Sequence, residues 1–164
     1  MPADRTVGTG SGLPGMTGQP APGRRWRRIL PGEEREIGKL RRWLAGLLPD
    51  CSARDDVISV ATELSANAVR HTASGQGGCF GVEVTCHGPV IRVAVADRGA
   101  ATEPRLIDDP MGEYGRGLML VHGLSVRTGV RGGDQGRLVW ADIPWNAGVP
   151  AAPVSSPSRQ AAVG

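Results

Sequence analysis

Cysteine is scarce in this chain of 164 residues, which has only Cys51, Cys79 and Cys86. The number is odd and no two cysteines have Cys-x-x-Cys spacing, so we expect reduced thiols rather than a disulfide framework. Long hydrophobic runs are also missing, since no apolar stretch approaches the ~18 residues of a membrane-spanning helix. The first thirty residues contain no hydrophobic targeting segment, which argues against secretion. We therefore expect a cytoplasmic protein with no membrane span.

A strong charge of one sign is equally absent, because the formal net charge is only +3 at pH 7. A dedicated nucleic-acid-binding protein would present a strongly basic face, so nucleic acid is not an expected partner. Residues 24–28 do combine basic and aromatic side chains, as nucleic-acid contacts often do. A solvated edge strand explains this segment better.

The 25 glycines and 13 prolines are unevenly distributed, with ten of them in residues 1–23. Residues 146–164 are mostly Ala, Pro, Ser, Val and Gly. Neither end can bury enough apolar surface to offset the entropy lost on ordering, so we expect two disordered tails. The remaining residues, 24–145, are numerous enough to form one domain with a single core.

Apolar periodicity between the tails predicts three helices and five strands. The first expected helix has helical spacing of the apolar residues Ile37, Leu40, Leu44, Leu47 and Leu48. The second begins with a capping box at Ser52–Asp55 and runs to residue 71, and the third is Gly117–Leu124. The expected strands are an edge strand at 25–30 and two hairpins, 79–86 with 90–97 and 125–130 with 136–143. Together they predict an α/β (α+β) two-layer sandwich, with three helices on one face of a mixed, mostly antiparallel sheet.

Polar side chains line one edge of the second predicted helix. Its core-facing stripe comprises Val57, Val60, Ala61, Leu64 and Ala68. Glu63, Asn67 and Arg70 lie beside that stripe on one edge of the helix. The Asn67 carboxamide oxygen is a suitable Mg²⁺ ligand, and Glu63 could accept a proton from a hydroxyl or a water molecule. A solvated helix border is the alternative interpretation. His71 and His122 fall at apolar positions, where packing is a better explanation than catalysis.

Asp97 is unusual because it shares a pleat face with Ile91, Val93 and Val95. An ionised carboxylate on an apolar face needs a hydrogen-bond donor, and the exocyclic amine of a nucleotide base would supply one. Gly99 follows closely and permits close backbone approach. The alternative is an aspartate that ends the strand and turns into the next loop.

A third candidate is Gly115-Arg116-Gly117-Leu118, at the start of the last predicted helix. Free N–H groups at the positive end of a helix bind anions, and glycine lets a ligand approach them. The preceding loop, residues 98–114, is long enough to cover a ligand as a lid. Arg116, with Arg98 or Arg105 from that loop, could add charged contacts to phosphate. A lone Gly-x-Gly is also common in ordinary turns.

In this order, these motifs resemble the Bergerat-fold ATP-binding family shared by gyrase, histidine kinases and heat-shock chaperone ATPases. More narrowly, the chain resembles the anti-sigma-factor serine kinases and their stand-alone relatives in actinobacteria. Glu63-Leu-Ser-Ala-Asn67-Ala-Val-Arg-His71 is similar to the asparagine box, Asp97-Arg-Gly99 to the first glycine box, and Tyr114-Gly-Arg-Gly-Leu118 to the second. Leu30-Pro-Gly32, before the first helix, also fits the group, and the likeness extends over residues 24–145.

The resemblance implies that ATP and Mg²⁺ are bound. It implies that Asn67 binds Mg²⁺ and that Glu63 is the general base. Asp97 would accept a hydrogen bond from the adenine amine, and Gly115–Leu118 would line the phosphates. Arg70, Gly99 and Arg105 join them as predicted cofactor-binding residues. The implied activity is that of an anti-sigma-type serine/threonine protein kinase, whose partners are a sigma factor and a small antagonist protein. A non-catalytic ATP-dependent protein-binding switch is the alternative, and a homodimer stays open.

Two positions depart from the family pattern. Ala101 stands where the first glycine box often has a second glycine, and Gly136-Arg137-Leu138 stands where the last strand usually has Gly-x-Thr. We assign the missing threonine to Leu138. Loss of its hydroxyl removes a hydrogen bond of roughly 0.5–1.5 kcal/mol, so weaker ATP binding is expected.

Overall fold

The computed structural model of the protein describes residues 20–99 and 113–145. Its order of elements is β1 Arg25–Pro31, α1 Glu34–Leu47, α2 Ser52–His71, the short 3₁₀ helix η1 Ala73–Gly75, β2 Cys79–His87, β3 Val90–Asp97, α3 Glu113–Leu124, β4 Arg127–Gly133 and β5 Gly136–Pro144. The described residues begin at position 20, and the Gly23 N–H donates to the Cys86 carbonyl at 2.8 Å. The remainder of both predicted tails lies outside the described residues.

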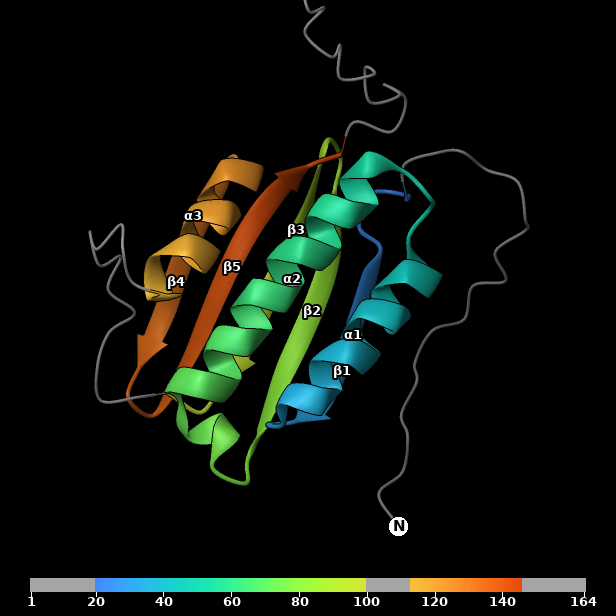
Figure 1. Cartoon of the computed structure of the whole chain (residues 1–164). Helices are drawn as coiled ribbons and strands as arrows, with labels where there is room; N and C mark the ends of the chain where they lie inside the picture. The colour runs from blue at the N-terminus through green and yellow to red at the C-terminus, as the bar shows by residue number, and fades with distance from the viewer. Residues whose placement is uncertain (1–19, 100–112, 146–164) are drawn as a thin grey trace, which may run out of the picture.

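The five strands form one sheet in the order β1-β2-β3-β5-β4, and α1, α2 and α3 cover one face of it (Figure 1). The predicted two-layer sandwich is therefore confirmed. All four described strand pairs are antiparallel, whereas a mixed sheet was expected. The reason is topological: β4 runs in the same direction as β3, but β5 returns through a tight turn and pairs between them. No parallel ladder can then form between β3 and β4.

Helix α2 lies between α1 and α3 and packs its apolar stripe on the sheet (Figure 1). Every residue predicted for this stripe is buried, namely Val57, Val60, Ala61, Leu64 and Ala68. The strand residues below it alternate in the same way, with Val82, Val84, Val93 and Val95 buried. Each such side chain contributes about 1.5–3 kcal/mol when fully buried, so this contact fixes the position of α2 over β2, β3 and β5.

The ends of the helices differ in part from the prediction. Helix α1 ends at Leu47 before Pro49, as expected. The prediction of a capping box at Ser52 is wrong. Ser52 is the first helical residue of α2, and the N-cap is Cys51, with no side-chain hydrogen bond at the cap. An extended Cys51 starts the helix one residue earlier, so the Ser52 hydroxyl does not occupy the capping position. No described helix is both long and apolar enough to cross a membrane.

Candidate nucleotide site

The second predicted helix and the last one meet at Glu63. A Cβ atom added at Gly117 of α3 would overlap Glu63 Oε2 and would lie 3.2 Å from Glu63 Cδ. Glycine at position 117 therefore leaves space that the Glu63 carboxylate fills. Two motifs far apart in the sequence are thus in contact in the folded chain.

Asn67 follows Glu63 by one turn of α2, and both residues are half-buried. They offer a carboxamide and a carboxylate oxygen, the hard donors that Mg²⁺ prefers. Among residues 20–99 and 113–145, no group of three or more His, Cys, Asp or Glu side chains could hold a metal. A Mg²⁺ ion at Asn67 would take its other ligands from phosphate and water, as this ion commonly does, so the residues fit the group.

Asp97 ends β3 on the apolar face, where Ile91, Val93 and Val95 are also buried. Its side chain is only 4% exposed. The Gly99 N–H donates to Asp97 Oδ1 at 2.6 Å, and Arg137 Nε lies 3.9 Å from the same oxygen. Burial raises the pKa of Asp97, while the Gly99 N–H and the positive charge of Arg137 act in the opposite direction. Asp97 therefore turns toward the loop at one oxygen while remaining on the buried face.

Gly99 holds the end of β3 against two neighbouring segments. It has φ +76°, and a Cβ there would overlap the Asp134 carbonyl in the turn between β4 and β5. On the other side, the Gly99 carbonyl accepts from the Ala73 N–H at 3.1 Å, and the Arg98 N–H donates to Ser74 Oγ at 3.0 Å. These contacts tie Asp97 to η1, which directly follows α2.

The register between β3 and β5 shows which residue of β5 lies beside Asp97. Asp97 pairs with Arg137, and Ala96 pairs with Leu138. Opposed residues of antiparallel strands point to the same face, and neighbours along a strand point to opposite faces. Leu138 therefore lies on the face away from Asp97, and the residue beside Asp97 is Arg137, whose side chain is 6% exposed.

The second glycine box lies within α3 rather than before it. Helix α3 includes Glu113, so Gly115–Leu118 belong to its first two turns. The glycines do not stop the helix, and Gly117 leaves the space that the Glu63 carboxylate occupies. N–H groups in a first turn have no intrahelical partner, so Gly115 and Arg116 keep the predicted position near the positive end. Arg116 is exposed, whereas Gly117 and Leu118 are half-buried.

Two further predicted residues, Arg70 and Arg98, lie on the surface. Arg70 Nε lies 3.0 Å from Glu34 Oε1 of α1, in an exposed ion pair, and Arg98 is also exposed. Arg105 and Ala101 lie outside the described residues. The expectation that His71 and His122 are packed is wrong, because both are exposed. A histidine in a terminal helical turn can point past the core that the preceding turns cover.

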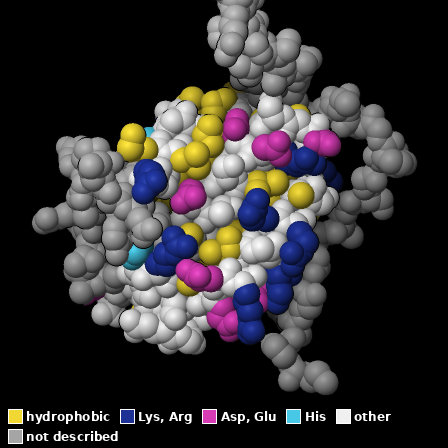
Figure 2. All heavy atoms as spheres, viewed as in Figure 1, with side chains coloured by type: hydrophobic (Ala, Val, Ile, Leu, Met, Phe, Trp, Pro, Cys, Tyr) yellow, Lys and Arg dark blue, Asp and Glu magenta, His cyan; other side chains and the backbone are white. Residues whose placement is uncertain are grey.

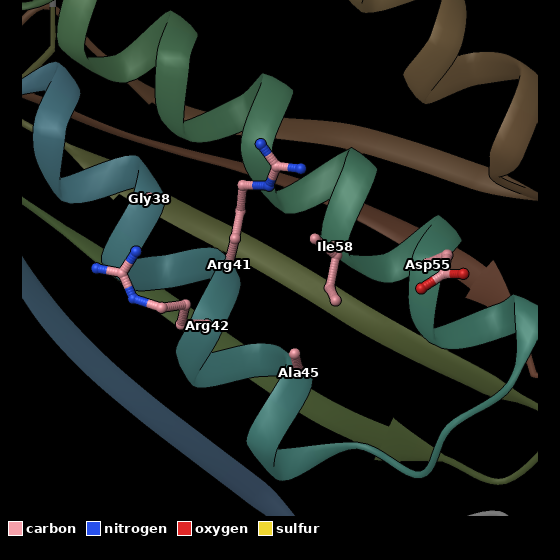
Figure 3. Close-up of a pocket in the computed structure, with 6 residues that line it drawn as sticks. All are labelled: Gly38, Arg41, Arg42, Ala45, Asp55 and Ile58. Atoms are coloured by element: carbon pink, nitrogen blue, oxygen red, sulfur yellow. The ribbon is translucent and has the colours of Figure 1, made fainter.

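A hollow of about 420 Å³ lies elsewhere, between α1 and α2 (Figure 3). It is lined by Gly38, Arg41, Arg42, Ala45, Asp55 and Ile58. None of these is a predicted site residue, and the hollow faces α1 rather than α3. Basic and acidic side chains are interspersed over this side of the molecule (Figure 2).

Comparison with known families agrees with the geometry. A model of the histidine kinase-like ATPase domain matches residues 30–143, which run from β1 to β5 and contain all three motifs. No curated protein matches the chain. The match covers most of the sequence, and the contact between Glu63 and Gly117 joins two of the motifs in space. This chain therefore belongs to the histidine kinase-like ATPase domain family.

Proposed function

We propose that this protein binds ATP with Mg²⁺ and is a serine/threonine protein kinase of the anti-sigma type. It would hold a sigma factor and phosphorylate a small antagonist protein. The contact between Glu63 and Gly117 carries the proposal, because it places a carboxylate beside the helix expected to bind phosphate. Membership of the ATPase family supports the nucleotide-binding half of the proposal.

Each residue of the site has a distinct task in this proposal. ATP, when bound, supplies the phosphoryl group and leaves as ADP. The Glu63 carboxylate would take the proton that a serine or threonine hydroxyl loses. Asn67 would hold Mg²⁺, the first-turn N–H groups of α3 would face the phosphates, and Asp97 would accept a hydrogen bond from the base. Phosphoryl transfer requires mainly positioning and charge neutralisation, which a site of this size can supply.

The second candidate is a binding module in which ATP sets the affinity for a partner and is not consumed. The side chain beside Asp97 favours it, because an arginine and not a hydroxyl-bearing residue lies there. This candidate predicts nucleotide-dependent partner binding without loss of phosphate from ATP.

The test combines calorimetry with a transfer assay. ATP is titrated into the pure protein with and without Mg²⁺, and we expect saturable binding that Mg²⁺ strengthens. The protein is then incubated with γ-labelled ATP and, one at a time, with small antagonist-type proteins of its source organism. Acid-stable label on one of them, as phosphoserine or phosphothreonine, supports the kinase. Nucleotide binding with no label on any of them favours the switch.

Replacing Gly117 by alanine should impair the site without unfolding the protein. The new Cβ would displace the Glu63 carboxylate, and misplacement of a reacting group by about 1 Å can lower a rate by about 100-fold. Alanine is a better helix former than glycine by about 1 kcal/mol, so the thermal unfolding temperature should not fall. The measurement is the initial rate of phosphoryl transfer.

Gly123→Ala is the matched control, because a Cβ at Gly123, on the same helix, meets nothing within 4 Å. Equal transfer rates in the two alanine variants would show that Glu63 does not depend on the space at Gly117.

A further inference from the structure

The buried arginine beside Asp97 is not explained by the family pattern. Arg137 lies directly across from Asp97 in the antiparallel pair of β3 and β5, on the face that the helices cover. The two side chains are 6% and 4% exposed, and Arg137 Nε is 3.9 Å from Asp97 Oδ1. A charge buried to this extent is costly unless it is paired. A cation next to the Asp97 carboxylate is therefore favoured at position 137.

An arginine beside Asp97 has a different chemistry from a hydroxyl in the same place. A hydroxyl can donate or accept a hydrogen bond, whereas a guanidinium has five N–H donors and no acceptor. Asp97 is an acceptor only, and its Oδ1 already faces the Gly99 N–H and Arg137. The pair presents a carboxylate acceptor next to guanidinium donors.

We propose that Arg137 is a second base-reading residue of the nucleotide site and makes it selective for adenine. Adenine carries a donor, its exocyclic amine, next to an acceptor, the ring nitrogen N1. Asp97 would accept from the amine, and Arg137 would donate to N1. The inference rests on the proposed binding of ATP and adds a residue that sets its specificity.

The same pair of side chains disfavours guanine. Guanine has an acceptor, O6, where adenine has the amine, and a donor, N1–H, where adenine has an acceptor. Acceptor would then face acceptor at Asp97, and donor would face donor at Arg137. A hydroxyl could reorient to relieve the second conflict, but an arginine cannot. Arg137 therefore disfavours the binding of guanine and also favours the binding of adenine.

The test uses ATP and 1-deaza-ATP, in which a C–H group replaces N1 and the amine is kept. Calorimetry gives the ratio of their dissociation constants for the wild type and for Arg137→Met, Arg137→Lys and Arg131→Met. We expect the wild type to bind 1-deaza-ATP about tenfold or more weakly, the value for a hydrogen bond to a charged group. The ratio should approach one in Arg137→Met, be intermediate in Arg137→Lys, and equal the wild-type ratio in Arg131→Met, which changes an exposed arginine of β4.

Other results would overturn the inference in distinguishable ways. A wild-type ratio near one, with ATP binding intact, removes the role of Arg137 and leaves the nucleotide site in place. An unchanged ratio in Arg137→Met does the same. Tighter binding of both nucleotides by Arg137→Met, at an unchanged ratio, would show that the arginine obstructs the site. Absence of ATP binding by the folded wild type contradicts the proposed function together with this inference. If Arg137→Met does not fold, the wild-type ratio and Arg137→Lys still decide.

Discussion

Glu63→Gln should lower the rate of phosphoryl transfer by about 10²- to 10⁴-fold, the contribution typical of a positioned general base. The amide has the shape of the carboxylate, so it can occupy the space beside Gly117, but it cannot take the proton of a hydroxyl. ATP affinity should stay close to that of the wild type, because Asp97 and the first turn of α3 are unchanged. The measurements are the initial transfer rate at saturating ATP and the dissociation constant of ATP.

Glu34→Gln is the matched control for this variant. Glu34 forms an exposed ion pair with Arg70, and pairs of this kind contribute about 0–1 kcal/mol to stability. Its transfer rate should equal that of the wild type. Full transfer by Glu63→Gln would remove Glu63 from the role of base and would leave ATP binding unaffected.

Asp97→Asn should weaken ATP binding by about tenfold or more, because the buried acceptor loses its charge and with it a strong hydrogen bond. Calorimetric titration of ATP into the wild type and the variant measures this effect. Wild-type ATP affinity in Asp97→Asn would show that the base lies elsewhere.

The pH dependence of Asp97 gives a second measurement on the same residue. Burial raises the pKa of Asp97 in the folded protein above its ordinary value of 3.8. The folded state then binds a proton more tightly than the unfolded state, so the contribution of Asp97 to stability falls as pH rises from 3.8 through the raised pKa. ATP binding needs the ionised form and should weaken when pH falls through the same raised pKa. Both effects should be missing from Asp97→Asn when its pH profiles are compared with those of the wild type.

Most of the fold prediction came from the periodic spacing of apolar residues in the helices and strands. The stripe that begins at Val57 is buried as a 3.6-residue period requires. The two-residue period of β3 likewise predicted that Asp97 shares a face with three buried apolar side chains. These patterns are local, because each depends only on neighbours along the chain. They predicted the two-layer sandwich and the side of α2 on which Glu63 and Asn67 lie.

The errors concern relations between segments that are far apart in the sequence. The departure from the family pattern was assigned to Leu138, yet the pairing of β3 with β5 puts Arg137 beside Asp97. A shift of register by one residue moves every side chain to the other face, and nothing within β5 alone reports which register is formed. The start of α3 and the space at Gly117 could not be predicted from local sequence either, since both depend on the approach of α2.

The sequence by itself determined on which face of its own helix or strand each candidate side chain stands. Tertiary structure alone decided which of them meet: Glu63 with Gly117, and Asp97 with Arg137. The physical reason is that side-chain direction follows from local backbone periodicity, whereas contact between distant segments follows from strand register and helix packing.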